Sequence, residues 1–270
     1  MLGFTFNGKH CFNDFGIVMK SKNRPILPEP KEIVEDVPSI DGEYDFSEAN
    51  PEGRTKYKTK PIEVECTFFQ KDLTYLRIRA HEIAAWLSCG KKPLIFDDET
   101  PVYYLAKVSN QLDLEQQIAQ LGWFTINFKC DPYAYGVISS NEQLKFGQGL
   151  ICGYGYRLDM VPTIYTITEP TTIKVYNPGT FVKPIIKITG TGSNISIASG
   201  LKTLHYNKAF SNAELKIDCK KMQTTLNGVN VNNDITGDED IELVNGNNDI
   251  QINGSNLNIT VTLEFKYLYS

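Results

Sequence analysis

The segment GWFTINFKCDPYAYG, residues 122–136, contains a strand that ends abruptly. Apolar residues alternate with polar ones from Phe124 to Cys130, which is the pattern of a strand with one buried face. Pro132 cannot donate a hydrogen bond to a sheet, and Gly136 frees the backbone to turn. An ordinary strand end is one interpretation of this stop, and a domain boundary is the other.

Composition on the two sides of this stop favours the boundary. Residues 1–140 contain six asparagines and residues 141–270 contain fifteen, while both tryptophans lie in the first half. A chain of 270 residues is also at the upper limit for one hydrophobic core. We therefore expect a first domain over residues 1–136, a linker over 137–164 and a second domain over 165–270.

The first half predicts antiparallel strands and one helix. FTFNG and the run ending at Asp41 and Gly42 both carry hairpin signals. Residues 62–68 alternate between apolar and polar, and two further alternating segments, 102–114 and 117–130, predict a hairpin. The helix is expected between Asp72 and Gly90, with Trp86 in the core. Its predicted buried stripe consists of Leu73, Leu76, Ala80, Ile83, Ala84 and Leu87.

The second half predicts short strands alone. Alternating runs recur between turn signals, among them VKPIIKITGTG, SNISIASG, DIQINGS and NLNITVTLEFKYLY. Short strands separated by Asn and Gly turns are typical of a β-sandwich. The whole chain is thus expected to be mainly β with one substantial α-helix: an α+β antiparallel sheet domain followed by a β-sandwich.

Charge and hydropathy exclude several classes of partner. The net charge is −5, and neither half carries the excess of positive charge that binding to a phosphate backbone requires. Arg54, Lys56, Lys58 and Lys60 alternate along what we interpret as a solvated edge. No apolar run has the roughly 18 residues that a membrane span needs, and no signal peptide is evident. We expect synthesis in the cytoplasm, no membrane insertion and no sequence-specific nucleic acid partner.

No arrangement of residues predicts catalysis or a cofactor. His10, His81 and His205 are the three histidines, and no GxSxG nucleophile motif occurs. The acidic run Asp97, Asp98 and Glu99 is interpreted as a turn, because consecutive carboxylates on an extended chain alternate in direction.

Metal binding is not predicted either. Asp234, Asp238 and Asp240 lack the spacing of a calcium loop. Six scattered cysteines without a CxxC pair are expected to be reduced and mostly buried. Three glycosylation sequons are attributed to the abundance of asparagine: Asn194, Asn253 and Asn258.

Sugar binding by residues 165–270 is the open alternative. Sugar recognition commonly uses an exposed aromatic ring. This half has no tryptophan, and Tyr206 and Phe210 are the only aromatic residues between Ile188 and Leu263.

Several motifs in order resemble the siphophage distal tail protein family, often called Dit. In the first half they are FTFNG, DFGI (14–17), IDGEYD (40–45), AAWL (84–87), PLIFDDE and CDPYAYG. In the second half they are NPGTFVKPIIKITG, LKID (215–218), LNGVN (226–230) and LVNGNNDIQING. The resemblance implies a tail-component domain followed by a galectin-like or jelly-roll sandwich. The second half of the chain lacks the tryptophan of a galectin sugar site.

The resemblance implies an architectural role at the virion tail tip. Members of this family form a hexameric ring that joins the tail tube protein to a tail-associated fibre or lysin and to the host-adsorption apparatus. Tape-measure and receptor-binding proteins are further expected partners. Two alternatives stay open: a lectin-like adhesin that binds host-surface carbohydrate, and a cell-wall hydrolase.

Overall fold

The computed structural model describes residues 3–39, 41–50, 52–69, 73–110, 123–145, 154–157 and 159–270. The chain divides into two compact units between Tyr135 and Gly136, and Ser270 is grouped with the first. The structure is mainly β, with antiparallel sheets in both units. Among the described residues, no helix has the length and apolar character needed to cross a membrane.

The first unit is built on one antiparallel sheet with the order β2-β1-β7-β8-β9-β6-β3. Its strands are β1 (Phe4–Phe6), β2 (Lys9–His10), β3 (Ile17–Asn23), β6 (Lys60–Phe68), β7 (Lys92–Phe96), β8 (Val102–Val108) and β9 (Phe124–Cys130). The predicted alternation of β6 and β9 is confirmed. Along each strand, every second side chain is buried, and the side chains at the intervening positions are exposed or partly exposed. The FTFNG hairpin is also confirmed: Asn7 and Gly8 both have positive φ, as a tight two-residue turn requires.

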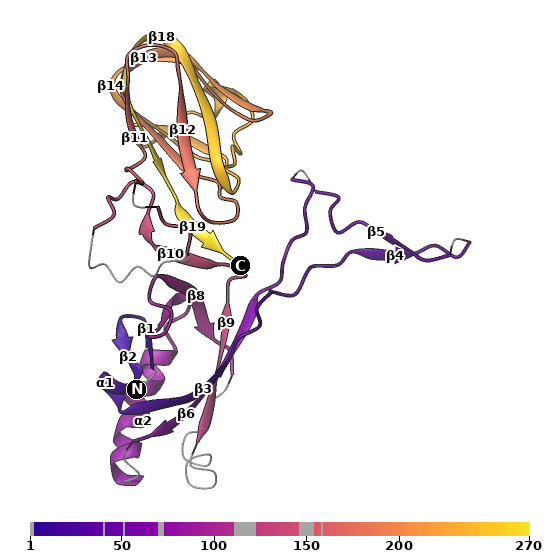
Figure 1. The fold of residues 1–270 in the computed structure, drawn as a ribbon, viewed down its shortest axis with the longest axis vertical. Coiled ribbons are helices and arrows are strands. Elements are labelled where there is room, and N and C mark those ends of the chain that lie inside the picture. Colours follow the sequence, from indigo (N-terminus) through magenta and orange to yellow (C-terminus); the bar gives the residue numbers. More distant parts are fainter. Residues whose placement is uncertain are drawn as a thin grey trace. The chain divides into compact units, whose positions relative to one another are not determined.

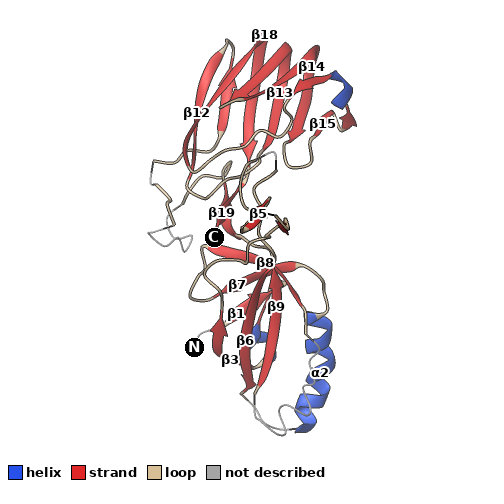
Figure 2. Cartoon of the chain, turned by 90° about the vertical axis from the view of Figure 1, so that its right-hand side faces the viewer, coloured by secondary structure: helices blue, strands red, loops and turns tan. Residues whose placement is uncertain are grey.

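Two helices accompany this sheet, α1 (Cys11–Phe15) and α2 (Leu73–Leu87). Figure 2 shows α2 in blue beside the strands. The indole of Trp86 anchors α2 to the sheet. Trp86 is 4% exposed, stacks on Phe15 and donates from Nε1 to the backbone oxygen of Phe6 at 2.7 Å. Ile83 and Leu87 are buried as predicted, whereas Ala84 is exposed, because the buried side of the helix follows Ile83 and Trp86 instead. The predicted cap Asp72 and the side chains of residues 73–78 and 80 lie outside the described part.

The chain between β3 and β6, residues 24–59, forms an arm. It carries a separate two-stranded sheet of β4 (Val34–Asp36) and β5 (Glu43–Asp45), in which Glu35 faces Tyr44. Closer to the body, Pro30 bridges to Tyr57, so the two sides of the arm run together. Figure 1 shows β4 and β5 beyond the ends of β3 and β6.

The second unit contains a sandwich made by folding one sheet. Its strands are β11 (Ile164–Ile167), β12 (Thr171–Asn177), β13 (Ile185–Ser199), β14 (Lys202–Asp218), β15 (Gln223–Leu226), β16 (Val229–Asn230), β17 (Ile235–Gly237) and β18 (Gly246–Glu264), with the 3-10 helix η1 (Asn232–Asp234). One half of β18 pairs with β12 and the other with β11, and β14 likewise divides between β17 and β15. Side chains of both halves meet in one buried cluster, so the halves face each other as two layers.

This construction corrects the sequence-based strand assignment. From Ile185 on, the segments VKPIIKITGTG and SNISIASG form one strand, β13. DIQINGS and most of NLNITVTLEFKYLY are likewise joined in β18, and the last residues of that run form β19 (Lys266–Tyr269). The Gly and Asn residues of these segments bend a continuing strand through bulges instead of reversing the chain. Asn194, Asn212 and Asn256 take positive φ at the bends of the three long strands. Asn194, one of the sequons, therefore has a backbone role.

The stretch expected as a linker, residues 137–164, differs from that expectation at both ends. β10 (Ala134–Ser139) continues through its start and pairs with β19 (Lys266–Tyr269). Ser140 Oγ and Thr163 Oγ1 both donate to the backbone oxygen of Leu263, at 2.7 and 2.5 Å. These hydrogen bonds fix the two ends of the stretch to β18 within the second unit.

Candidate functional site

The three histidines lie apart and have different surroundings. His10 is structural: its Nδ1 accepts from the backbone N–H groups of Phe12 and Asn13, both at 3.2 Å, and caps α1. Its Nε2 lies 3.2 Å from Asp97 Oδ2. His81 on α2 and His205 on β14 are exposed. The structure does not bring the three together.

The acidic run after β7 serves as a set of anchors. Asp97 contacts His10, Asp98 pairs with Lys22 at 2.6 Å, and Glu99 pairs with Arg24. Tyr104 also donates to Glu99, at 3.0 Å. Each carboxylate therefore binds a different side chain, as consecutive residues of a turn do, instead of converging on one point.

The acidic loop of the second unit is divided in the same way. Asp234 pairs with Lys208, and Asp240 with Lys183 and Lys202. Asp238 accepts from the backbone N–H of Thr203. In the described part of the chain, no three His, Cys, Asp or Glu side chains are grouped to hold a metal ion.

Cysteine thiols are protected by burial. Cys11, Cys66, Cys130 and Cys219 are buried and unpaired, and Cys89 is half-buried. Desolvation raises the pKa of Cys130 and of Cys219 to about 12, which keeps both as unreactive thiols. Cys152 lies outside the described residues.

The basic stretch before β6 is not a uniform solvated edge. Lys56 pairs with Glu52, and Lys58 with Glu29, near the surface. Lys60 is 2% exposed and donates from Nζ to the backbone oxygen of Ile26 at 3.1 Å. Lys60 was thus misassigned, because its position opposite Cys130 in the sheet turns its side chain inward.

The two aromatic residues considered for sugar stacking are core residues. Tyr206 and Phe210 are 1% and 6% exposed and pack against each other. Neither ring offers a free face to a sugar.

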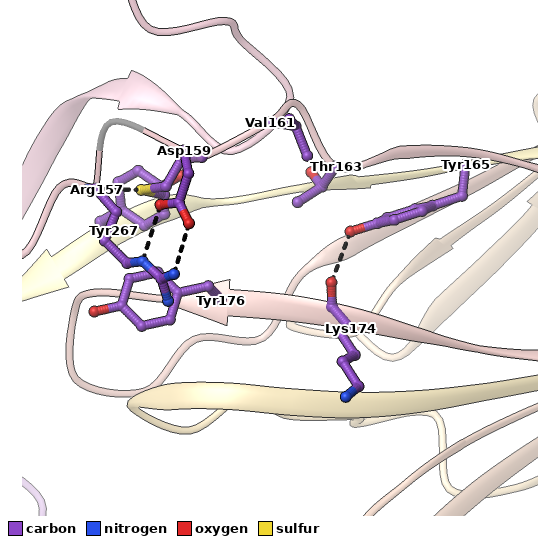
Figure 3. A pocket seen from close by; sticks show the side chains of 9 residues that line it. Arg157, Asp159, Val161, Thr163, Tyr165, Lys174, Tyr176 and Tyr267 are labelled. Atoms are coloured by element: carbon purple, nitrogen blue, oxygen red, sulfur yellow. Dashed lines mark hydrogen bonds and ion pairs between the residues drawn. The ribbon is translucent and has the colours of Figure 1, made fainter.

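A pocket of about 160 Å³ lies on the second unit (Figure 3). Arg157 binds Asp159 through two hydrogen bonds and also lies over the ring of Tyr176. The Tyr165 hydroxyl donates to the backbone oxygen of Lys174 at 2.9 Å. The arginine and the aspartate at this pocket therefore satisfy each other.

Six of the fourteen large hydrophobic residues that are exposed in the described part of the chain lie in the arm of the first unit. Large exposed hydrophobic residues gather there: Ile26, Leu27, Ile33, Val34, Tyr44 and Phe46. Monomeric soluble proteins rarely leave such residues grouped, and grouped exposure marks interaction surfaces. A two-stranded sheet is also only marginally stable in water by itself.

The register gives the end of the arm two different faces. Directly opposed residues share a face, and Ile33 opposes Phe46 next to the pair of Glu35 and Tyr44. One face, the aromatic face, therefore carries Ile33, Glu35, Tyr44 and Phe46, with the two rings stacked at 6.2 Å. The other, the acidic face, carries Val34, Asp36, Glu43 and Asp45. The sequence analysis did not identify this surface, although the acidic residues of the arm lie close together in the sequence.

Comparison with known proteins gives two family matches in order along the chain. Residues 14–130 match the phage tail protein RIFT-related domain, and residues 179–269 match the C-terminal domain of siphovirus-type tail components. Together these matches cover more than two thirds of the chain. No curated protein sequence matches it.

The solved structures that match this chain include one that is similar over the whole length. It is the Dit (gp 19.1) protein of phage SPP1, described as a paradigm of the hub adsorption apparatus in phages that infect Gram-positive bacteria. The similarity covers 99% of both chains with a TM-score of 0.66, at 14% sequence identity. The two chains therefore share a fold.

Proposed function

This chain belongs to the siphophage distal tail protein family, and on that premise we propose that it is the structural hub at the tip of a long phage tail. The observation that carries this proposal is the presence of both family domains, in order, on one chain with the fold of a hub protein. Function is then delivered by surfaces and not by a catalytic site, which agrees with the separation of His10, His81 and His205.

The hub is a ring of six copies. It joins the tail tube protein on one side to the tail-associated fibre or lysin on the other, within the virion. A ring needs heterologous contacts, in which one surface of each copy meets a different surface of the next. The exposed arm of the first unit is the surface best suited to make such a contact.

Electron microscopy tests this proposal directly. Negative-stain images of the purified protein, alone and mixed with the tail tube and tail-tip proteins of the same phage, should show six-fold rings. Particles that remain monomeric in every mixture would contradict the hub. Zymography on host cell walls should show no clearing, and a zone abolished by one His or Asp substitution would instead support the hydrolase.

A further inference from the structure

The acidic face of the arm contains an unfavourable charge pair. Asp36 directly opposes Glu43, and both side chains are exposed. Neither forms an ion pair with another described residue. Residues 32–48 contain seven acidic residues and no basic one. Because like charges in direct opposition destabilise a sheet, the end of the arm is suited to a cationic partner.

The body of the first unit contains the matching pair of opposite sign. Lys107 of β8 directly opposes Lys129 of β9. Both point away from the core, since their neighbours Ala106 and Cys130 are buried, and both are exposed. No ion pair joins either lysine to another described residue. Two lysines in cross-strand opposition have the same spacing as the Asp36 and Glu43 pair.

We propose that Asp36 and Glu43 of one copy bind Lys107 and Lys129 of a second copy of this chain. This inference rests on the proposed ring and names the contact that closes it. Every copy carries one acidic pair and one lysine pair, so the two are present in equal numbers in any assembly of this chain. Their charges are opposite and their cross-strand spacing is alike.

The position of the lysine pair sets the direction of the contact. Lys129 faces Pro61, close to where the arm rejoins the sheet in β6. Asp36 is about 13 residues beyond Asn23, the last residue of β3, so an extended arm reaches at most about 45 Å. That reach is well beyond a unit whose expected radius of gyration is about 14 Å. The end of one arm therefore meets the base of the next, which is a head-to-tail contact of the heterologous kind that a ring requires.

Charge reversal tests the contact. Asp36→Lys with Glu43→Lys gives a chain with lysines on both surfaces, and Lys107→Glu with Lys129→Glu gives a chain with acids on both. Each variant alone should self-associate at least about tenfold more weakly than the natural chain, because every contact then opposes like charges. Sedimentation velocity over a concentration series measures this change, and thermal unfolding checks that each variant is folded.

Mixing the two variants is the decisive experiment. In an equimolar mixture, the lysines on the arm of the first variant meet the acidic residues on the sheet of the second variant. The natural acidic arm of the second variant meets the natural Lys107 and Lys129 of the first. Association should return, in rings with an even number of copies. The matched control is Glu169→Lys with Asp249→Lys, two exposed residues of the second unit. It makes the same change in net charge as the arm variant and should leave association unchanged.

The outcomes separate this inference from the hub itself. Reversed variants that associate like the natural chain, or a mixture that fails to recover, would overturn the contact while rings in the microscope still support the hub. A natural chain that stays monomeric at the highest attainable concentration and low salt would also overturn it. Rings absent even with the tail partners would overturn both. Loss of binding to a tail partner, with self-association intact, would assign the arm to that partner and overturn the second-copy contact.

Discussion

Gly190 lies at the bend of β13 in a conformation that other residues rarely adopt. Its φ is +128°, and a Cβ placed there would lie 2.2 Å from the backbone oxygen of Asn258 in β18. Because the Asn258 oxygen belongs to the backbone and cannot rotate away, the clash can be relieved only if β13 and β18 move apart at the fold of the sandwich.

We expect Gly190→Ala to lower the free energy of unfolding by about 3 kcal/mol. Gly200→Ala is the matched control, since Gly200 has φ +60° with open space around its Cα. That variant should lose only about 1 kcal/mol, the strain of a left-handed alanine. Urea denaturation followed by circular dichroism measures both, and equal losses would show that the clash is absent.

Lys60 predicts a dependence of stability on pH. Burial lowers the pKa of its amine, so near pH 9 to 10 the unfolded chain binds more protons at this position than the folded chain. The contribution of Lys60 to stability therefore improves as pH rises. If Lys60→Met has a higher free energy of unfolding than the natural chain at about pH 7, that difference should be smaller at about pH 10. Denaturation at both pH values tests this, with exposed Lys58→Met as control, and a constant difference would contradict it.

At the scale of elements, the arm is separable from the sheet that carries it. Within the described part of the chain, β4 and β5 pair with each other and with no other strand. The body is held by contacts such as those of Trp86 with Phe6 and Phe15. We expect a chain in which Asn-Gly replaces residues 31–56 to keep the unfolding midpoint of the first unit, as judged by tryptophan fluorescence. The same chain should form no rings in negative-stain images. Rings without the arm would show that another surface closes them.

Alternation along the sequence predicts the strands that have one buried face, and β6 and β9 are examples. It cannot tell a turn from a bend, because Gly and Asn supply positive φ to both. Whether GTGSN reverses the chain depends on its pairing with β14 and β18, which are distant in sequence. The same limit applies to Lys60, whose burial is decided by its pairing with Cys130, and to the arm, whose faces follow from the register of Asp36 with Glu43.

At the scale of the whole molecule, charge bears on how a hub treats DNA that leaves through the tail. Lysine and arginine contacts with phosphates release counterions and hold DNA non-specifically. The chain has a net charge of −5, with 16 basic and 20 acidic residues before residue 140. Its exposed lysine pair, Lys107 and Lys129, shares the outward face of the sheet with Glu63 and Glu65.

We therefore expect no binding of duplex DNA by the natural chain at about 0.15 M salt, where charges are screened beyond about 8 Å. In the unassembled chain, where Lys107 and Lys129 are not covered by the arm of another copy, Glu63→Lys with Glu65→Lys would place four lysines on the adjacent strands β8, β9 and β6. That variant should bind DNA, with an affinity that falls steeply as salt rises, by a slope of about −0.9 for each phosphate contacted. A mobility-shift titration measures both chains. Micromolar binding by the natural chain would contradict the prediction.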